Sequence, residues 1–448
     1  MWWSLSQLGG RGGEQSESGA LSVIGLLNAY APVLIVAFVV TLLATPVFRR
    51  LAEHMGVVDR PDLNRKLHAY PVAYLGGMAV FLGMLVAIGV SYVITDDQPS
   101  SFMPVPLAIV VGMVAITFTG FADDVWGWDP RLKIAGQLVA AAALAIENVG
   151  VKVAAGVLEP IVGADNLAAM PIDVVYWVGT ALIALFVLGG CNAANLIDGL
   201  DGLLTGVVGI VALGLLAISL LMVPQTPINV LDSGDGTLAG ARIVLCMALL
   251  GSVMGFLPHN FKPASIFLGD CGSLLLGYIC VVIILMFGEY GQTHLVFAGL
   301  IVFAVPIIDT TLAIIRRKLA GTPMSAGDDQ HLHHQLKRAL GGVRRAVFTL
   351  YALSFLFAIL GVTLAALVML TELRVRMIYT IAIVLFGIVG MIAIKSARGR
   401  LRAMTEARLA AGADAPATPA AVTGRPTPPS KSPAIDVTQS GSSRAGIV

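Results

Sequence analysis

The residues that could do chemistry in this chain are acids, amides and histidines gathered beside long apolar runs. Asp123 and Asp124 stand together at the end of one run, and Asp270 precedes another in the stretch F-L-G-D-C-G-S. Residues 192–203, N-A-A-N-L-I-D-G-L-D-G-L, place two asparagines and two aspartates at intervals of three. Residues 328–336, D-D-Q-H-L-H-H-Q-L, hold three histidines within four positions. Such clusters suit a hard cation such as Mg²⁺, which binds through one or two carboxylates and the phosphates of a substrate.

Each cluster also has a structural explanation. Neighbouring Asp123 and Asp124 repel each other, and proteins usually tolerate this only where a metal, a cation or a shared proton compensates, so a functional role is favoured. Asp198 alone would be read as a helix cap. The three histidines could bind zinc, but no further Cys or His cluster in the sequence completes four ligands. The sequence therefore favours a site for a divalent cation and a diphosphate.

Basic side chains near these clusters could hold the remaining phosphate charge. The candidates are Arg65, Lys66, Lys133, Arg316 and Arg317. For the last two, the ordinary positive flank of a membrane span is an equally good explanation.

The stretch 192–203 is expected on a loop at the membrane surface. Spacing by three drifts about 60° per step on a regular helix, and Gly199 and Gly202 would let the chain leave that path. On a loop, the polar backbone would meet water instead of lipid.

Long apolar runs must position these residues. The chain of 448 residues is 57% hydrophobic and 12% charged, whereas soluble domains are about 25% charged. Eleven runs have the length, roughly 17–25 residues, that a helix needs to cross the bilayer, and they do not alternate in polarity as barrel strands do. They are 27–48, 72–94, 105–122, 132–147, 174–190, 204–223, 239–257, 272–288, 295–315, 347–370 and 377–395. The sequence thus predicts an all-α polytopic membrane protein with about eleven transmembrane helices.

The lysines and arginines predict the orientation of these helices. With the N-terminus outside, 23 of the 28 basic residues fall on the cytoplasmic side, so the positive-inside rule predicts the N-terminus out and the C-terminus in. All four polar clusters then lie on the cytoplasmic face. We therefore expect them to converge on one site.

Three regions follow from this pattern. Residues 1–26 form an extracytoplasmic segment without a signal-peptide pattern, residues 27–395 form the transmembrane domain, and residues 396–448 form a disordered cytoplasmic tail rich in Ala, Pro, Ser, Thr and Gly. The four cysteines lack metal-ligand spacing. The net charge of +1, without a basic stripe, predicts no nucleic-acid partner.

The ninth run contains two residues that are unusual inside a membrane span. Pro306, in A-V-P-I-I-D-T, should kink or break the helix because it removes a backbone hydrogen bond. Asp309 lies within the apolar run, and an intramembrane acid is a functional candidate by default. A carboxyl group satisfied by backbone freed at the kink explains it equally well.

Five motifs in this order resemble one enzyme family. D-D at the end of a span, N-A-A-N-L-I-D-G-L-D-G, F-L-G-D-C-G-S, P-I-I-D-T and H-L-H-H are similar to those of the polyprenyl-phosphate N-acetylhexosamine-1-phosphate transferases. The similarity runs from about residue 30 to 395, and the H-x-H-H pattern is most like the bacterial undecaprenyl-phosphate N-acetylglucosamine-1-phosphate transferases.

This resemblance implies a reaction, a setting and a cofactor. Undecaprenyl phosphate would attack a UDP-N-acetylhexosamine, most simply UDP-GlcNAc, to give a lipid diphospho-sugar and UMP. This would be the first membrane step of a cell-envelope polysaccharide pathway, at the cytoplasmic face of the bacterial inner membrane. The cofactor would be Mg²⁺, with Mn²⁺ as a substitute, and a homodimer stays open.

The resemblance also implies roles for individual residues. Asn195 and Asp270 would bind the metal, and Asp123, Asp124 and Asp198 would be the catalytic acids, the first two positioning the lipid phosphate. Contacts to the substrate would come from Lys66, Lys133, Asp201, Phe267, His331, His333 and His334, with Phe267 stacked on uracil.

Departures from the family pattern leave alternatives open. Ala73 stands where a second proline is usual, and Asp329 and Gln335 stand where arginines commonly flank the histidines. GalNAc, a deoxy amino sugar or MurNAc-pentapeptide could therefore replace GlcNAc.

A cation-coupled secondary transporter is the competing class, but transporters place their acids near the bilayer midplane, often between inverted repeats. Here three of the four candidate acids, Asp123, Asp198 and Asp270, lie at span ends, only Asp309 lies inside a span, and no internal repeat is evident.

Overall fold

The computed structural model describes residues 23–59, 71–93, 103–223, 237–321 and 331–371, and scattered helical positions between 375 and 406. Residues 1–398 form one compact unit and residues 399–448 a second. About half of the predicted eleventh run, nearly all of the predicted tail and the first 22 residues of the predicted N-terminal segment lie outside the described residues.

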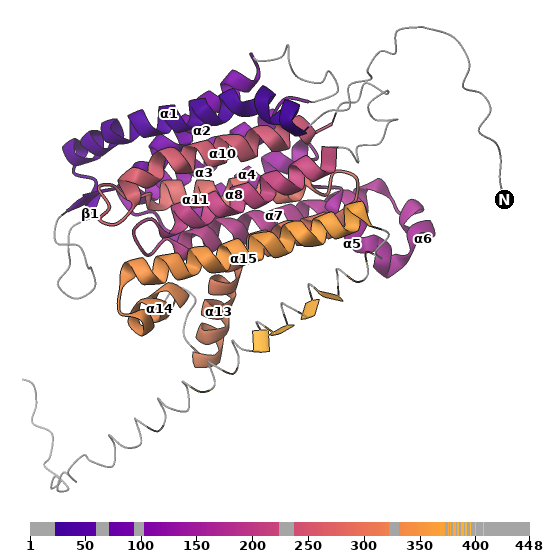
Figure 1. Cartoon of the computed structure of the whole chain (residues 1–448). Coiled ribbons are helices and arrows are strands. Elements are labelled where there is room, and N and C mark those ends of the chain that lie inside the picture. The colour runs from indigo at the N-terminus through magenta and orange to yellow at the C-terminus, as the bar shows by residue number, and fades with distance from the viewer. Residues whose placement is uncertain are drawn as a thin grey trace, which may run out of the picture. The chain divides into compact units, whose positions relative to one another are not determined.

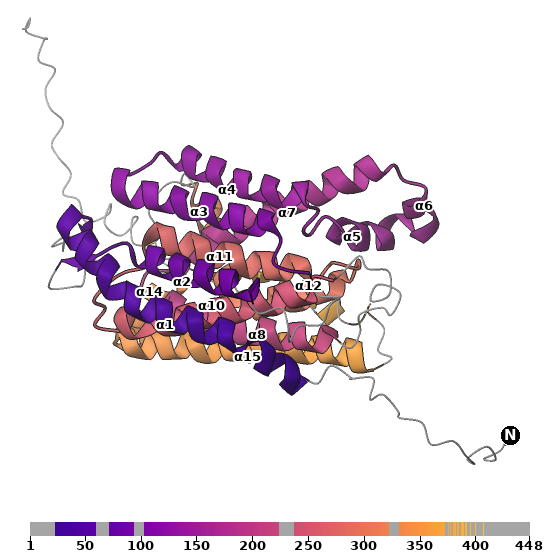
Figure 2. The same ribbon diagram turned by 90° about the horizontal axis from the view of Figure 1, so that it is seen from above.

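Helices lie side by side throughout the first unit (Figures 1 and 2). In chain order they are α1 (Val23–Met55), α2 (Gly76–Ser91), α3 (Leu107–Trp126), α4 (Pro130–Ile146), α5 (Val153–Val162), α6 (Ala164–Ala168), α7 (Ile172–Ile197), α8 (Leu203–Met222), α10 (Ala239–Asn260), α11 (Gly269–Met286), α12 (Thr293–Val302), α13 (Ala304–Ala320), α14 (Leu332–Leu340) and α15 (Val343–Leu370). Two short strands, β1 (Val58–Asp59) and β2 (Val72–Ala73), follow α1.

These helices confirm an all-α polytopic membrane protein. Within the described residues, seven helices are long and apolar enough to cross a membrane, or eight if the bent pair α12 and α13 is one span. Large apolar side chains such as Ile24, Leu43 and Leu185 are more than 60% exposed, as expected of surfaces that face lipid. The first ten predicted runs all coincide with helices, whereas the total of eleven and the orientation stay predictions.

Helix α11 lies in the middle of the bundle because its sequence is apolar on every side. It packs between α3 and α7 on one side and α8 and α10 on the other, which Figure 2 shows from above. Glycines allow the closest approaches: a Cβ on Gly77 would overlap Gly272, and a Cβ on Gly120 would overlap the backbone of Cys271. Small residues at such crossings bring helix backbones together in membranes, and here they bring the end of α3 to the start of α11.

The ninth predicted run is broken, as Pro306 predicts. Helices α12 and α13 meet at Phe303 with a bend of 79°, and in Figure 1 α13 runs across the direction of α15. The break falls three residues before Pro306, which lies in the first turn of α13. A proline is tolerated there because the first-turn N–H groups have no helical partner.

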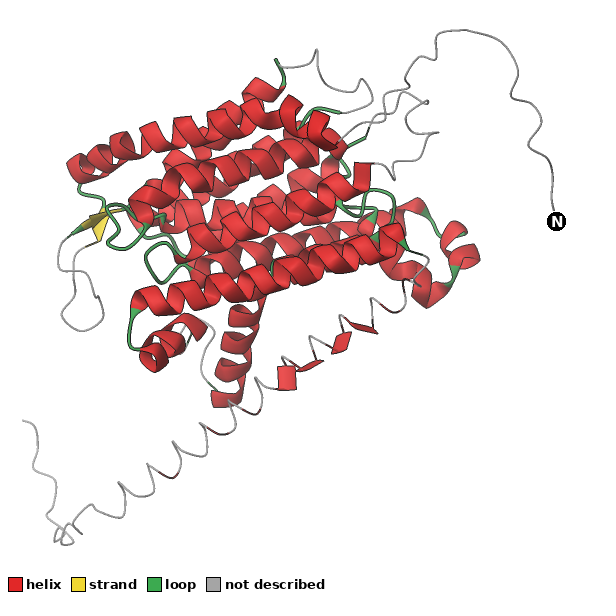
Figure 3. Ribbon diagram, in the orientation of Figure 1, coloured by secondary structure: helices red, strands yellow, loops and turns green. Residues whose placement is uncertain are grey.

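A small sheet ties the segment after α1 to the segment before α11 at one end of the bundle (Figure 3). Strands β1 and β2 pair antiparallel, with Val58 opposite Ala73. Ala73 also bridges in parallel to Ile266, and its carbonyl accepts a hydrogen bond of 2.8 Å from the N–H of Phe267. This pairing fixes the backbone of Phe267, the first residue of the F-L-G-D motif.

Candidate active site

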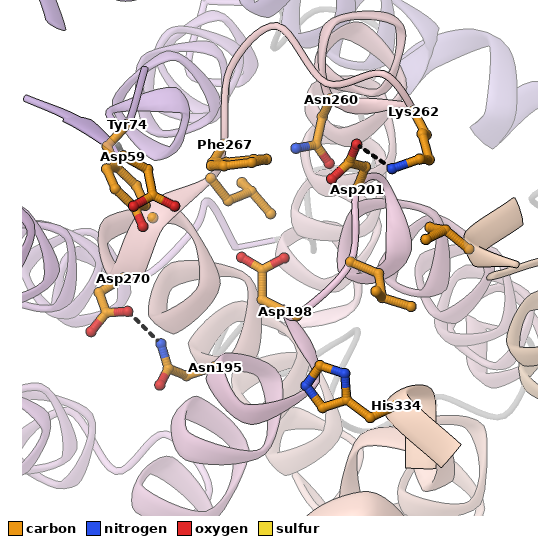
Figure 4. A pocket seen from close by; sticks show the side chains of 15 residues that line it. Asp59, Tyr74, Asn195, Asp198, Asp201, Asn260, Lys262, Phe267, Asp270 and His334 are labelled. Atoms are coloured by element: carbon orange, nitrogen blue, oxygen red, sulfur yellow. Dashed lines mark hydrogen bonds and ion pairs between the residues drawn. The ribbon is translucent and has the colours of Figure 1, made fainter. Parts of the chain in front are cut away.

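A pocket of about 350 Å³ opens where the α7–α8 loop meets the segment that leads into α11. Figure 4 shows its side chains converging from several elements. The lining residues are Asp59, Tyr74, Asn195, Asp198, Gly199, Leu200, Asp201, Asn260, Lys262, Phe267, Leu268, Gly269, Asp270, His334 and Val343. The predicted convergence of the polar clusters on one site agrees with this arrangement.

The first half of the asparagine and aspartate stretch is helical, so the expected loop is wrong there. Helix α7 continues through Ile197 and carries both Asn192 and Asn195 in its last two turns. Asp198 is the cap residue that ends the helix, and the loop is confined to the few residues before α8. Its last residue, Gly202, has a φ of 74°, a left-handed conformation that favours glycine. A tight turn rather than a long loop thus brings Asp198 and Asp201 into the pocket beside Asn195, whereas Asn192 does not line it.

A lysine joins two of the predicted acids. The Nζ of Lys133 lies 2.8 Å from Oδ2 of Asp123 and also pairs with Oδ2 of Asp270. The amide of Asn195 donates to Oδ1 of Asp270 at 2.7 Å and to Oγ of Ser273 at 2.9 Å. Side chains from α3, α4, α7 and α11 therefore meet at one carboxylate, that of Asp270.

Asp124 does not line the pocket but holds the backbone of Asp270 through hydrogen bonds. Its Oδ1 accepts a hydrogen bond from the N–H of Asp270 at 2.8 Å, and its Oδ2 accepts one from the N–H of Cys271 at 3.0 Å. The first N–H groups of a helix have no helical partner, and a carboxylate there also interacts well with the helix dipole. Asp124 thus caps α11 and fixes the position of Asp270.

The pKa of Asp198 is unusually high for an aspartate. Burial, followed by the nearby carboxylates of Asp270, Asp124 and Asp201, raises the pKa of Asp198 to about 8. Desolvation and like charges both disfavour the ionised form of an acid. The pocket therefore holds more carboxylate than its own cations neutralise.

The donor set of the pocket fits Mg²⁺. The carboxylates of Asp270 and Asp198 and the amide of Asn195 offer hard oxygen ligands, and the excess of acids favours a divalent cation. No group of three His, Cys, Asp or Glu residues in the described part of the chain could hold a metal by itself. Mg²⁺ commonly takes only one or two carboxylates from the protein and completes its shell with phosphates and water.

Other parts of the pocket wall are built by aromatic rings and a further acid. Phe267 lies beside Tyr74, with ring centroids 6.0 Å apart and a tilt of 57°. Asp201 accepts a hydrogen bond of 3.2 Å from the N–H of Ala264 and lies 3.6 Å from Nζ of Lys262. These parts combine a flat apolar ring with donors and acceptors, as a nucleobase would require.

Sequence reasoning missed four of the lining residues. Asn260 and Lys262 stand in H-N-F-K-P-A, just ahead of the predicted F-L-G-D motif, and this proximity is the signal that could have found them. Asp59 and Tyr74 flank the predicted basic stretch and are brought in by the small sheet. Burial, and then Asp124, Asp270 and Asp198, raise the pKa of Tyr74 to about 12, so its hydroxyl keeps its proton and can donate.

The histidines divide into two groups. His334 lines the pocket, whereas His331 and His333 are buried, at 6% and 1% exposure, and turn their Nδ1 atoms toward Asp309. Lys66, also predicted to bind substrate, lies outside the described residues.

Comparison with known proteins places this chain among enzymes. Residues 106–288 match the protein family described as glycosyl transferase family 4. A protein of Bacillus subtilis (strain 168), named probable undecaprenyl-phosphate N-acetylglucosaminyl 1-phosphate transferase, is 33% identical over 341 residues, which cover 74% of this chain and 85% of that protein. The chain belongs to glycosyl transferase family 4.

Two further relatives in the family differ in their named substrates. The decaprenyl-phosphate N-acetylglucosaminephosphotransferase of Mycolicibacterium smegmatis is 32% identical over 352 residues, 72% of this chain and 79% of that protein. The phospho-N-acetylmuramoyl-pentapeptide-transferase of Bacillus cereus (strain AH187) is 28% identical over 340 residues, 73% of this chain and 95% of that protein. The resemblance that the five motifs indicate is thereby confirmed.

Proposed function

We propose that this protein transfers GlcNAc-1-phosphate from UDP-GlcNAc to undecaprenyl phosphate, giving undecaprenyl-diphospho-GlcNAc and UMP. The observation that carries the proposal is a single pocket that combines acids and an amide with an aromatic ring. Asp270 and Asn195 line the part where a diphosphate would be held, and Lys133, which does not line the pocket, pairs with Asp270 beside it. Phe267 and Asp201 line the same pocket and offer a ring and an acid for a uracil. The names of the relatives from Bacillus subtilis and Mycolicibacterium smegmatis support GlcNAc as the sugar.

The proposed transfer does not need a strong base from the protein. An oxygen of the lipid phosphate attacks the β-phosphorus of the UDP-sugar, and the bond between that phosphorus and the bridging oxygen breaks to release UMP. A phosphate monoester, with a second pKa near 6, is already mostly ionised at pH 7. Phosphoryl transfer then depends on alignment and charge neutralisation.

The residues of the pocket would supply that alignment. Lys133 would exchange part of its pairing with Asp123 and Asp270 for phosphate oxygens, while Phe267 stacks on the base. Asp270 and Asn195, with Asp198 nearby, would hold Mg²⁺, which when bound neutralises charge on the diphosphate. Asp123 would position the lipid phosphate, and Asp124 would act through Asp270 by capping α11.

The setting of the reaction belongs to the same proposal. An N-terminus outside the cell, eleven spans and a pocket at the cytoplasmic face of the bacterial inner membrane are supported by the distribution of Lys and Arg. A soluble nucleotide and a membrane-bound lipid phosphate can meet only at such a surface. A transporter has less support, because Asp198 and Asp270 line one pocket at helix ends.

The decisive experiment is an assay of UMP release. Purified protein would receive undecaprenyl phosphate, Mg²⁺ and, in separate reactions, UDP-GlcNAc, UDP-GalNAc, a UDP-deoxy amino sugar or UDP-MurNAc-pentapeptide. We expect UMP release with UDP-GlcNAc, dependent on lipid phosphate and metal. Release with another sugar alone would change the substrate, and no release with any sugar alongside cation flux in liposomes would overturn the reaction class.

A further inference from the structure

Asp309 is a fully buried acid for which the transfer reaction has no direct use. Its side chain has no exposed surface, and it lies in α13, past the break at Phe303. Removing a carboxylate from water is costly unless charged or hydrogen-bonding partners compensate. The partners of Asp309 therefore indicate what the acid does.

All the described partners of Asp309 come from the start of the histidine segment. Oδ1 accepts a hydrogen bond of 2.7 Å from the N–H of Leu332. Oδ2 lies 3.1 Å from Nδ1 of His331 and 3.7 Å from Nδ1 of His333. The carboxylate of the broken span thus holds the backbone of the segment with one oxygen and faces two of its imidazoles with the other.

This arrangement orients the imidazole of His331, whereas His333 lies near the same carboxylate without a hydrogen bond to it. A carboxylate can only accept hydrogen bonds when it is ionised, so Nδ1 of His331 must carry the hydrogen. In a neutral ring Nε2 is then the free acceptor, and the tautomer is set by the partner at Nδ1. The rings of His331 and His333 lie nearly parallel, at an angle of 12° and with centroids 5.5 Å apart.

The histidines connect Asp309 to the wall of the pocket. His333 packs against Gly199 so closely that a Cβ on Gly199 would overlap Nε2 of the ring. His333 also contacts His334, with ring centroids 4.3 Å apart. Both Gly199 and His334 line the pocket, so a line of contacts runs from α13 through His333 to two parts of its wall.

We propose that Asp309 is a positioning residue for the transfer reaction, acting through His331 and His333 to hold His334 and the Gly199 turn against the bound substrate. This inference rests on the proposed function for its kinetic consequence. Its structural part, the anchoring of the histidine segment by Asp309, can be tested without any turnover.

The kinetic test is a double-mutant cycle. Asp309→Asn keeps the shape and an acceptor for the N–H of Leu332 but removes the charge, and removing the partner that orients a functional histidine typically lowers activity by about 10- to 100-fold. We expect such a loss in kcat, with a change in KM for UDP-GlcNAc of less than about threefold, since Phe267 and Asp201 stay in place. Because both residues act as one unit, adding His331→Asn should cause little further loss.

The matched control is Glu289→Gln. Glu289 is another nearly buried acid, paired with Arg242 at 2.7 Å and bonded to the N–H of Leu238. None of these three residues lines the pocket. Any effect of Glu289→Gln on kcat should be independent of His331→Asn, so that the fold-losses of the two variants multiply in the double mutant. Wild-type kcat in Asp309→Asn, or losses that multiply between Asp309→Asn and His331→Asn, would overturn the proposal.

The second readout is independent of turnover. Diethyl pyrocarbonate labels accessible imidazoles, and we expect mass spectrometry to find His331 and His333 protected in the intact protein and labelled several-fold faster in Asp309→Asn. Equal labelling rates would refute the anchoring.

If wild type releases no UMP while the labelling differs, the proposed function fails and the anchoring stands. If Asp309→Asn does not fold, Asp309→Glu, which keeps the charge on a longer stem, should fold and lose kcat, and full kcat there would count against the proposal.

Discussion

Asp270 is the side chain on which the site depends most, because Lys133, Asn195 and the cap from Asp124 all meet at it. We expect Asp270→Asn to lower kcat by at least about 10²-fold, since losing a carboxylate that neutralises the transferring phosphate should cost several kcal/mol of transition-state stabilisation. UMP release at limiting Mg²⁺ measures this effect. Near wild-type activity under that condition would remove Asp270 from the metal site.

Asp198 predicts a pH dependence of stability. Its pKa is about 8 in the folded protein against 3.8 as a free side chain, so between these values the folded state binds more protons than the unfolded state, and stability falls as pH rises. The neutral side chain in Asp198→Asn escapes this loss. We expect the variant to be more stable than wild type at pH 8 by on the order of 1–3 kcal/mol, after discounting for partial exposure, and equal to it near pH 4.

Thermal melting in detergent with EDTA, at pH values from 4 to 9, measures the difference. Glu159→Gln, which removes an exposed acid on α5, serves as the control and should show no such trend. A gain from Asp198→Asn that is independent of pH would contradict the assigned cause.

At the scale of elements, the turn between α7 and α8 has no room for a side chain at Gly199. Gly199→Ala should push His333 or the turn aside, because a Cβ there overlaps the ring, and overpacking typically costs about 1–3 kcal/mol. We expect kcat/KM to fall by about tenfold. The control is Gly189→Ala in the preceding helix, α7, where nothing lies within 4 Å of an added Cβ. Equal activities of the two variants would contradict the packing argument.

The sequence predicted the helices better than it predicted where they end and how their ends pack together. Apolar length located the helices, and Pro306 located the broken span, because both depend on local composition. The continuation of α7 to Ile197 and the cap that Asp124 provides for α11 were not predictable, since each depends on a partner more than 70 residues away. Asp59 and Tyr74 were missed for the same reason: the backbone pairing of the segment around Ala73 with residues 266–268 brings them to the pocket.

At the scale of the whole molecule, the orientation of the bundle can be tested by labelling. Arg131 and Glu147 are exposed at opposite ends of α4, and the four native cysteines are buried, so the background should be low. A membrane-impermeant maleimide applied to intact cells should label Glu147→Cys and spare Arg131→Cys until the membrane is permeabilised. The reverse pattern would place the pocket on the outer face.

The bridge between Ala73 and Ile266 has a consequence for synthesis of the protein. Roughly 190 residues separate these partners, and at about 5–20 residues per second a ribosome needs on the order of 10–40 s to make them. During that interval the two short strands have been translated but their third neighbour does not exist. The pocket is therefore completed late, after α10 has left the ribosome, and a nascent chain that stalls earlier would carry inserted helices without a binding site.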